Sequence, residues 1–173
     1  MKIAIISDTH DNYPNLEKAL AWMKENQIEQ IIHCGDLCAP SMIKNILGLK
    51  FFGLIHMIFG NIEDRDKTPA AAKKFPQITH YGDQGEIEIP ASPAGGDGKK
   101  IAFVHYPLEA KELAKLGDYD IVFYGHTHKP WEETIGRTRL ANPGTSAGMF
   151  AKATFAVYDT KNNELELKIL EKL

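Results

Sequence analysis

A series of short apolar runs, each closed by Asp, Asn or His, constrains the fold of this chain more than any other feature. The runs are rich in β-branched residues and too short for helices, which is typical of strands buried on both faces of a sheet. Segments with apolar residues at helical spacing separate them, over about 14–26, 40–47 and 108–116. The alternation predicts an α/β fold. The strands are expected at KIAIIS (2–7), QIIHC (30–34), LIHMIFG (54–60), KKIAFVH (99–105) and DIVFYGH (120–126).

The middle and the last third of the chain have a different pattern. A short helix is expected over 65–75, ITHYGD and EIEIP should form a small antiparallel pair, and the Gly- and Pro-rich stretch 90–98 should be an exposed hairpin loop. In the last third, apolar and polar residues alternate, which predicts antiparallel strands with one solvated face. The segments concerned are WEETI (131–135), TRLANPG (138–144), ATFAVYD (153–159) and ELELKIL (164–170).

Length and composition are those of one globular domain, residues 1–173. The formal net charge of −3 gives no support for a long basic track along nucleic acid. The apolar run Ile3–Ile6 is too short for a signal peptide, and no stretch reaches the roughly 18 apolar residues of a membrane span. We therefore expect a cytoplasmic protein. Cys34 and Cys38 lack the spacing of a structural zinc site and are expected to be reduced thiols, at least one of them buried.

Polar residues of a limited kind follow the five apolar strands. In an open α/β sheet, loops at the carboxyl ends of the strands converge on one edge, where ligands bind. A single Asp at such a place is more often a helix cap or turn residue, and a single His is more often structural, as we expect for His33, His56 and His80. The repetition at successive strand ends instead predicts one shared site. Its members are Asp8, His10, Asp36, Asn61, His105, His126 and His128.

These side chains indicate the class of metal. Imidazole mixed with carboxylate suits Mn²⁺, which we expect first, or Ni²⁺, Co²⁺, Fe²⁺ and Zn²⁺, rather than Ca²⁺. Seven ligands are too many for one tetrahedral ion and fit two divalent ions roughly 3.5–4 Å apart. Such a pair needs a bridging carboxylate, and Asp36, from a central strand, can supply one oxygen to each ion.

The same motifs resemble those of the calcineurin-like metallophosphoesterases, and within that group the small bacterial and archaeal phosphodiesterases. The resemblance runs from Met1 to about Asp159 and also includes the late segment Asn142-Pro143-Gly144-Thr145. The motifs that carry it are Asp8-Thr9-His10, Gly35-Asp36, Gly60-Asn61, His105 and Gly125-His126-Thr127-His128.

The resemblance implies a β-sandwich of two mixed sheets flanked by helices, with the late antiparallel strands forming much of the second sheet. It implies one ion held by Asp8, His10, Asp36 and His128, and another held by Asp36, Asn61, His105 and His126. The implied reaction is metal-dependent hydrolysis of small phosphate esters, foremost phosphodiesters, by a hydroxide that the two metals activate. Asp36 and Asn61 are the catalytic residues in this interpretation. The alternatives are a non-catalytic metal-binding scaffold of the same fold and a nuclease on single strands.

Two positions depart from the family pattern. Larger members carry a general-acid His after the Asn of the third-strand motif, and the small subfamily usually carries Cys-Asp, whereas this chain has Ile62-Glu63. The fourth motif usually reads His-Gly-His, and here His105 is followed by Tyr106-Pro107. Protonation of the leaving group is therefore left to another acid, Glu63 or water, although Glu63 is equally well explained as a surface or supporting residue. Asn12, Glu63 and Tyr106 are the predicted substrate contacts.

Self-association is also implied by the resemblance, as a homodimer or homotetramer, and no membrane partner is expected. Five large apolar residues are candidates for the interface, with burial in the core as the alternative for each. They are Phe51, Phe52, Trp131, Met149 and Phe150.

Overall fold

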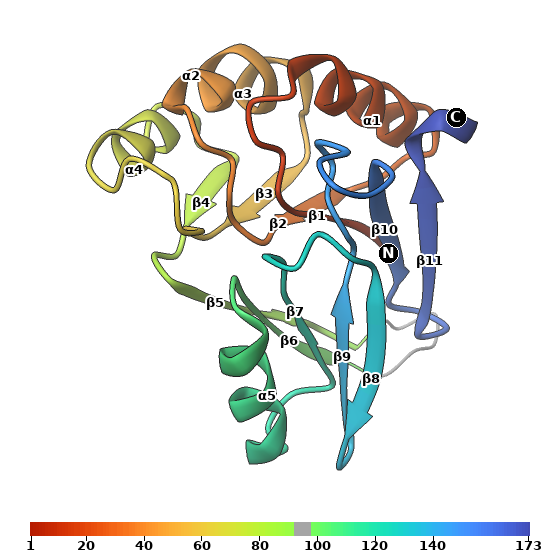
Figure 1. The fold of residues 1–173 in the computed structure, drawn as a ribbon. Helices are drawn as coiled ribbons and strands as arrows, with labels where there is room; N and C mark the ends of the chain where they lie inside the picture. Colours follow the sequence, from red (N-terminus) through yellow and green to blue (C-terminus); the bar gives the residue numbers. More distant parts are fainter. Residues whose placement is uncertain (92–97) are drawn as a thin grey trace.

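Two β-sheets pack face to face, and helices cover their outer surfaces (Figure 1). The computed structural model describes residues 1–91 and 98–173. The first sheet has the strand order β11-β10-β1-β2-β3-β4, and the second has the order β5-β6-β7-β9-β8. The strands are β1 (Lys2–Ile6), β2 (Gln30–His33), β3 (Leu54–Met57), β4 (Ile78–His80), β5 (Gln84–Ile89), β6 (Lys99–Val104), β7 (Ile121–Phe123), β8 (Trp131–Ile135), β9 (Thr138–Asn142), β10 (Thr154–Asp159) and β11 (Glu164–Ile169).

Both sheets are mixed, as the resemblance implied, and this confirms the predicted fold class. In the first sheet, β1 to β4 run parallel while β10 and β11 are antiparallel to their neighbours. In the second sheet, β6, β7 and β9 run parallel, and β5 and β8 are antiparallel edge strands. Parallel neighbours bring their carboxyl ends to one edge, so each sheet delivers its strand-end residues to one side of the molecule.

The alternation of side chains in β1 shows how the layers are held together. Ile3 and Ile5 point between the two sheets, whereas Ala4 and Ile6 point to the helices. Burial of an Ile side chain contributes roughly 1.5–3 kcal/mol, so a strand that is buried on both faces is a strong anchor for the sandwich. The layer between the sheets also contains Tyr158, whose ring packs edge-on against Phe123 at 5.7 Å between centroids.

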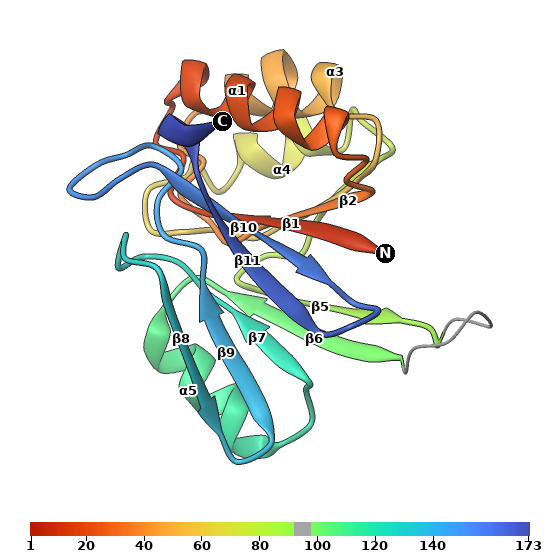
Figure 2. The ribbon, with the colours of Figure 1, turned by 90° about the vertical axis from the view of Figure 1, so that its right-hand side faces the viewer.

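Helices α1 to α4 lie on the first sheet and α5 lies on the second, at opposite ends of the layered structure (Figures 1 and 2). Helix α1 starts where the Asn12 side chain accepts a hydrogen bond from the Asn15 amide at 3.1 Å, with Pro14 in the first turn. A π-helical turn over Ile43–Leu47 joins α2 to α3. The helices are α1 (Tyr13–Glu25), α2 (Pro40–Met42), α3 (Gly48–Lys50), α4 (Lys67–Ala72), α5 (Pro107–Leu116) and a final 3₁₀ turn, Leu170–Lys172.

Two expectations about the strands were wrong, the pairing of ITHYGD with EIEIP and the solvated face of β10. ITHYGD and EIEIP do not pair, because β4 adds to β3 in the first sheet and β5 pairs with β6 in the second. Of the late strands, β8 and β9 lie in the second sheet, as the resemblance implied, whereas β10 and β11 extend the first sheet beside β1. Both faces of β10 are covered, because Phe155 packs under the helices and Tyr158 packs between the sheets.

The predicted hairpin loop at 90–98 falls mainly on residues 92–97, outside the described residues. The strands on either side of it, β5 and β6, pair antiparallel with Ile89 opposite Lys99. Within the described ranges, no helix has the length and the apolar character that crossing a membrane requires.

His33, at the end of β2, lies fully buried, and burial lowers the pKa of its imidazole to about 3. The unfolded chain therefore binds one more proton than the folded chain between about pH 3 and about pH 6.5, so acid weakens the fold. When the pH is lowered from about 7 to about 5, we predict that the unfolding free energy of the wild type falls by about 2 kcal/mol more than that of the His33→Gln variant. Urea unfolding at the two pH values measures the difference, and identical losses would contradict the prediction.

Candidate metal centre

The seven predicted site residues gather where the strand ends of the two sheets meet. Asp8 and His10 follow β1, Asp36 follows β2, and Asn61 follows β3 in the first sheet. The second sheet contributes the remaining three imidazoles, from the loops after β6 and β7. Contacts join the seven side chains into two groups that share a central carboxylate.

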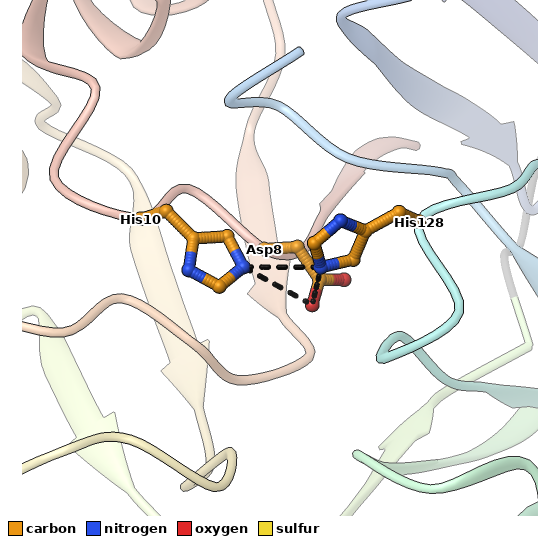
Figure 3. Close-up of side chains that lie close together, drawn as sticks. All are labelled: Asp8, His10 and His128. Carbon is orange, nitrogen blue, oxygen red and sulfur yellow. Dashed lines mark hydrogen bonds and ion pairs between the residues drawn. The ribbon is translucent and has the colours of Figure 1, made fainter. Parts of the chain in front are cut away.

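Asp8, His10 and His128 form the first group (Figure 3). The Nε2 atoms of the two imidazoles lie 3.1 Å apart, and Asp8 Oδ1 lies 3.3 Å from His128 Nε2 and 3.8 Å from His10 Nε2. Asp8 Oδ1 is buried and has no hydrogen-bond partner among the described residues. A buried carboxylate oxygen without a partner is costly. A cation held by these three atoms would remove that cost, so the first group fits a divalent metal.

Asn61, His105 and His126 form the second group. Asn61 Oδ1 lies 3.0 Å from His105 Nε2 and 3.0 Å from His126 Nδ1. The Nδ1–H of His105 donates to the Cys34 carbonyl at 2.8 Å, which leaves a lone pair on Nε2. Two acceptors, an amide oxygen and an imidazole lone pair, thus face one another. This arrangement also suits a metal ion.

Asp36 lies between the two groups. Its Oδ2 atom is 3.7 Å from His10 Nε2 and 3.6 Å from His105 Nε2. Its Oδ1 atom accepts hydrogen bonds from the backbone amides of Asn61 at 2.7 Å and Ile62 at 3.3 Å. Oδ2 thus faces an imidazole of each group, while Oδ1 accepts from the backbone after β3. The expected sharing of Asp36 between two ions stays a prediction.

Five of the seven site residues adopt left-handed backbone conformations. This region is uncommon for residues other than glycine and costs of order 1–3 kcal/mol at each position, and such residues concentrate at functional sites. The φ values are 52° for Asp8, 42° for His10, 59° for Asp36, 67° for His126 and 60° for His128. These left-handed turns lie at the strand ends whose side chains come together in the two groups.

Glycine is required beside two of the carboxylates because the backbone approaches them closely. A Cβ atom on Gly60 would lie 2.0 Å from Asp36 Oδ1. A Cβ atom on Gly125 would lie 2.8 Å from Asp8 Oδ2 and 1.9 Å from Ser7 Oγ. The Gly-Asn and Gly-His steps of the sequence are thus steric requirements of the site.

The end of β9 and the loop after it support the first group, a role that the pattern of strand-end residues did not predict. The Thr145 hydroxyl donates to the Asp8 carbonyl at 2.9 Å, and the Asn142 amide donates to the Gly125 carbonyl at 2.8 Å. The His128 Nδ1–H donates to the Met149 carbonyl at 3.3 Å, which directs Nε2 toward Asp8. The segment from Asn142 to Thr145, which is part of the family resemblance, is the sequence feature that could have predicted these contacts.

The three predicted substrate contacts lie in different surroundings. Both carboxylate oxygens of Glu63 accept backbone hydrogen bonds, from Leu37 at 2.8 Å and Gly60 at 2.7 Å, so Glu63 ties the loops after β2 and β3 together. The Asn12 side chain caps α1 and also donates to the Ala147 carbonyl at 2.9 Å. Tyr106 borders the site, with its ring 5.0 Å from that of His105. Contact of Asn12 and Tyr106 with substrate stays a prediction, and the engaged carboxylate of Glu63 argues for the supporting role.

Burial sets the protonation of the site. Desolvation lowers the pKa of His10 and of His105, which keeps these imidazoles neutral and able to donate a lone pair near neutral pH. Desolvation also raises the pKa of Asp8 to about 6 and that of Glu63 to about 7. Burial of the Asp8 and Glu63 carboxylates in their charged form therefore lowers the free energy of unfolding.

The remaining histidines and the cysteines occupy positions outside the two groups. His33 contacts the Thr9 hydroxyl at 3.1 Å, His56 contacts Tyr81 at 2.8 Å, and His80 accepts from the Gly82 amide at 3.1 Å. Cys34 and Cys38 are free thiols, and Cys34 is buried, as expected.

Acidic and imidazole side chains at converging strand ends, in a sandwich of two mixed sheets, define a metal-dependent hydrolase. The model of the calcineurin-like phosphoesterase superfamily domain matches residues 1–163. The chain belongs to this family, and it is a metal-dependent phosphoesterase.

Individual relatives agree with the family model. Phosphodiesterase MJ0936 of Methanocaldococcus jannaschii is 32% identical over 174 residues, which cover 99% of this chain and 100% of that protein. A probable metallophosphoesterase of Methanothermobacter thermautotrophicus is 27% identical over 155 residues, 84% of this chain and 77% of the relative. The solved structure of an archaeal phosphodiesterase has a TM-score of 0.85 and 29% identity, and the match covers 98% of this chain and 99% of that one. The expected family and fold are confirmed.

The unpartnered oxygen of Asp8 yields a prediction about metal removal. At neutral pH the buried, charged Asp8 destabilises the metal-free fold, since burial raises its pKa to about 6. The Asp8→Asn variant should therefore be about 1–3 kcal/mol more stable than the wild type in EDTA. Added Mn²⁺ should stabilise the wild type and stabilise the variant much less. Thermal unfolding of both proteins with EDTA and with Mn²⁺ measures this, and a variant that is less stable in EDTA would refute it.

Proposed function

We propose that this protein hydrolyses phosphodiesters with the help of two divalent metal ions. The observation that carries the proposal is the position of Asp36 Oδ2, 3.7 Å from His10 Nε2 and 3.6 Å from His105 Nε2. One carboxylate oxygen facing two separate donor groups suits a pair of ions better than a single ion. The phosphodiesterase relative, aligned over nearly the whole chain, supports the substrate class.

In this proposal each ion has its own donor set, and Asp36 belongs to both. Mn²⁺ is the ion we propose first, and Ni²⁺, Co²⁺, Fe²⁺ or Zn²⁺ would suit the same imidazole and oxygen donors. Asp8, His10, Asp36 and His128 would hold one ion. Asp36, Asn61, His105 and His126 would hold the other.

When bound, the ions supply Lewis acidity, which lowers the pKa of water toward neutrality and offsets the negative charge of the phosphate. The residues of the chain provide position and protonation state. Neutral His10 and His105 present lone pairs, and backbone amides fix the orientation of Asp36. In this proposal Asn61 stabilises charge on the phosphoryl group.

The direct test is hydrolysis of bis(p-nitrophenyl) phosphate with added Mn²⁺. We expect the Asp36→Ala and His126→Ala variants to lose at least about 10²-fold in kcat/KM, because each loses a donor that positions charge in the transition state. Asp118→Ala, which replaces an exposed aspartate outside the site, is the matched control and should keep wild-type activity. A wild type that is inactive with all five metals would instead favour the scaffold alternative.

Ile62 stands where larger relatives carry a general acid, and its side chain is 48% exposed. General-acid catalysis is worth roughly 10²–10⁴-fold, so esters with basic leaving groups should react slowly. We predict a steep dependence of rate on the pKa of the leaving group. The Ile62→His variant should flatten it and gain about 10-fold or more on poor leaving groups.

A series of substituted phenyl phosphodiesters with one constant ester group measures this slope. Ile62→Gln is the control, because it adds a polar side chain without an ionisable proton. A flat slope in the wild type would show that another group already protonates the leaving oxygen.

We further propose a cytoplasmic location, a small phosphate ester as substrate and self-association of the chain. Phe52, Trp131, Met149 and Phe150 are exposed and stay interface candidates, while Phe51 is buried in the core. The net charge of −3 argues for a small ester over a nucleic-acid strand.

A further inference from the structure

Phe150 combines an unusual exposure with a position beside the metal centre. It is 91% exposed, and its ring stacks on the imidazole of His128 with 5.9 Å between centroids and 26° between planes. His128 belongs to the first group of candidate ligands. An apolar ring therefore stands in solvent directly next to the site where the phosphate would bind.

The backbone holds this ring in place at a further cost. Phe150 has φ 60°, which is uncommon for a bulky residue, and Gly148 has φ 75°. Between them, the Met149 carbonyl accepts the hydrogen bond from His128 Nδ1. The same short loop thus orients the candidate ligand and presents the ring. Exposure and backbone strain are both unfavourable, and such costs are typical of functional positions.

Tyr106, on the other side of the centre, is a different kind of residue. Its ring packs edge-on against His105 at 5.0 Å and against His126 at 4.8 Å, and it is 37% exposed. Tyr106 therefore borders the site and packs on two candidate ligands. Phe150 has much more of its ring free for a partner.

We propose that Phe150 is a stacking platform that selects phosphodiesters whose retained ester group carries a planar aromatic ring, such as a nucleoside. The proposal rests on the proposed function, since it names the substrate class of that same site. Aromatic side chains stack on nucleobases through the flat π-face that every base has. A phosphate bound between the candidate ligands would bring such a ring onto the exposed Phe150.

The test compares two diesters with the same leaving group, thymidine 5′-(p-nitrophenyl) phosphate and methyl p-nitrophenyl phosphate, both with Mn²⁺. The quantity measured is the ratio of their kcat/KM values. Replacing a stacked aromatic residue by Ala costs roughly 5- to 150-fold in affinity for one base. We expect Phe150→Ala to lower the ratio by a factor in that range, and Phe150→Trp to keep it.

Leu116→Ala is the matched control. Leu116 is 65% exposed and is the last residue of α5, at the opposite end of that helix from Tyr106, so its removal should leave the ratio and both rates unchanged. Binding provides a second readout: Phe150→Ala should weaken calorimetric binding of thymidine 5′-monophosphate more than that of inorganic phosphate.

The outcomes separate the two proposals. A wild type that hydrolyses neither ester overturns the proposed function, and this inference with it. A wild type that hydrolyses both, with an unchanged ratio in Phe150→Ala, overturns the stacking platform alone. An equal loss for both esters, together with a smaller mass by light scattering, would show that Phe150 joins copies of the chain and would also overturn it.

Discussion

The Asp36 carboxylate is the interaction on which the rest of the centre depends. The backbone after β3 donates to Oδ1, and Oδ2 faces candidate ligands from both sheets. The approach of β2 to β3 at this point is so close that a side chain on Gly60 would overlap the carboxylate. The distance between the two groups is therefore set by packed backbone, which leaves little freedom for either half to move alone. Rigid placement of this kind is what a preorganised hydrolytic site needs.

That placement lowers stability, and the surrounding hydrogen bonds offset part of the cost. Left-handed conformations at five site residues and a buried, unpartnered oxygen on Asp8 are each unfavourable. The loop after β9 opposes them, because Ser146 and Ala147 donate backbone hydrogen bonds to the carbonyls of Ser7 and Asp8. Glu63 acts similarly between the loops after β2 and β3. The chain thus uses its own backbone to hold ligands that repel one another until a cation binds.

The sequence was sufficient to predict the buried strands and the residues at their ends, because both depend on local patterns. The run Ile3–Ile6 requires two covered faces wherever it lies. The pairing of strands was harder to predict. Ile78–His80 pairs with β3 and Thr154–Asp159 pairs with β1, but the residues of neither segment indicate which strand lies beside it. Hydrogen bonds between separate loops could not be predicted from the sequence for the same reason. That backbone donors occupy Oδ1 of Asp36, or both oxygens of Glu63, follows only from how separate loops meet.

The departures from the family pattern lie at the mouth of the site and not among the candidate ligands. All seven candidate ligands match that pattern, and bound metals would supply most of the chemistry of the reaction class. Ile62 stands where larger members carry a general-acid His, and Tyr106 stands where the pattern has a Gly. Such residues beside the candidate metal centre would select by leaving group and by shape, because an apolar side chain cannot donate a proton but can exclude water, and an aromatic ring can stack on another ring. We therefore look for the specificity of this enzyme in the residues around the candidate ligands, and for its mechanism in the candidate ligands that match the family pattern.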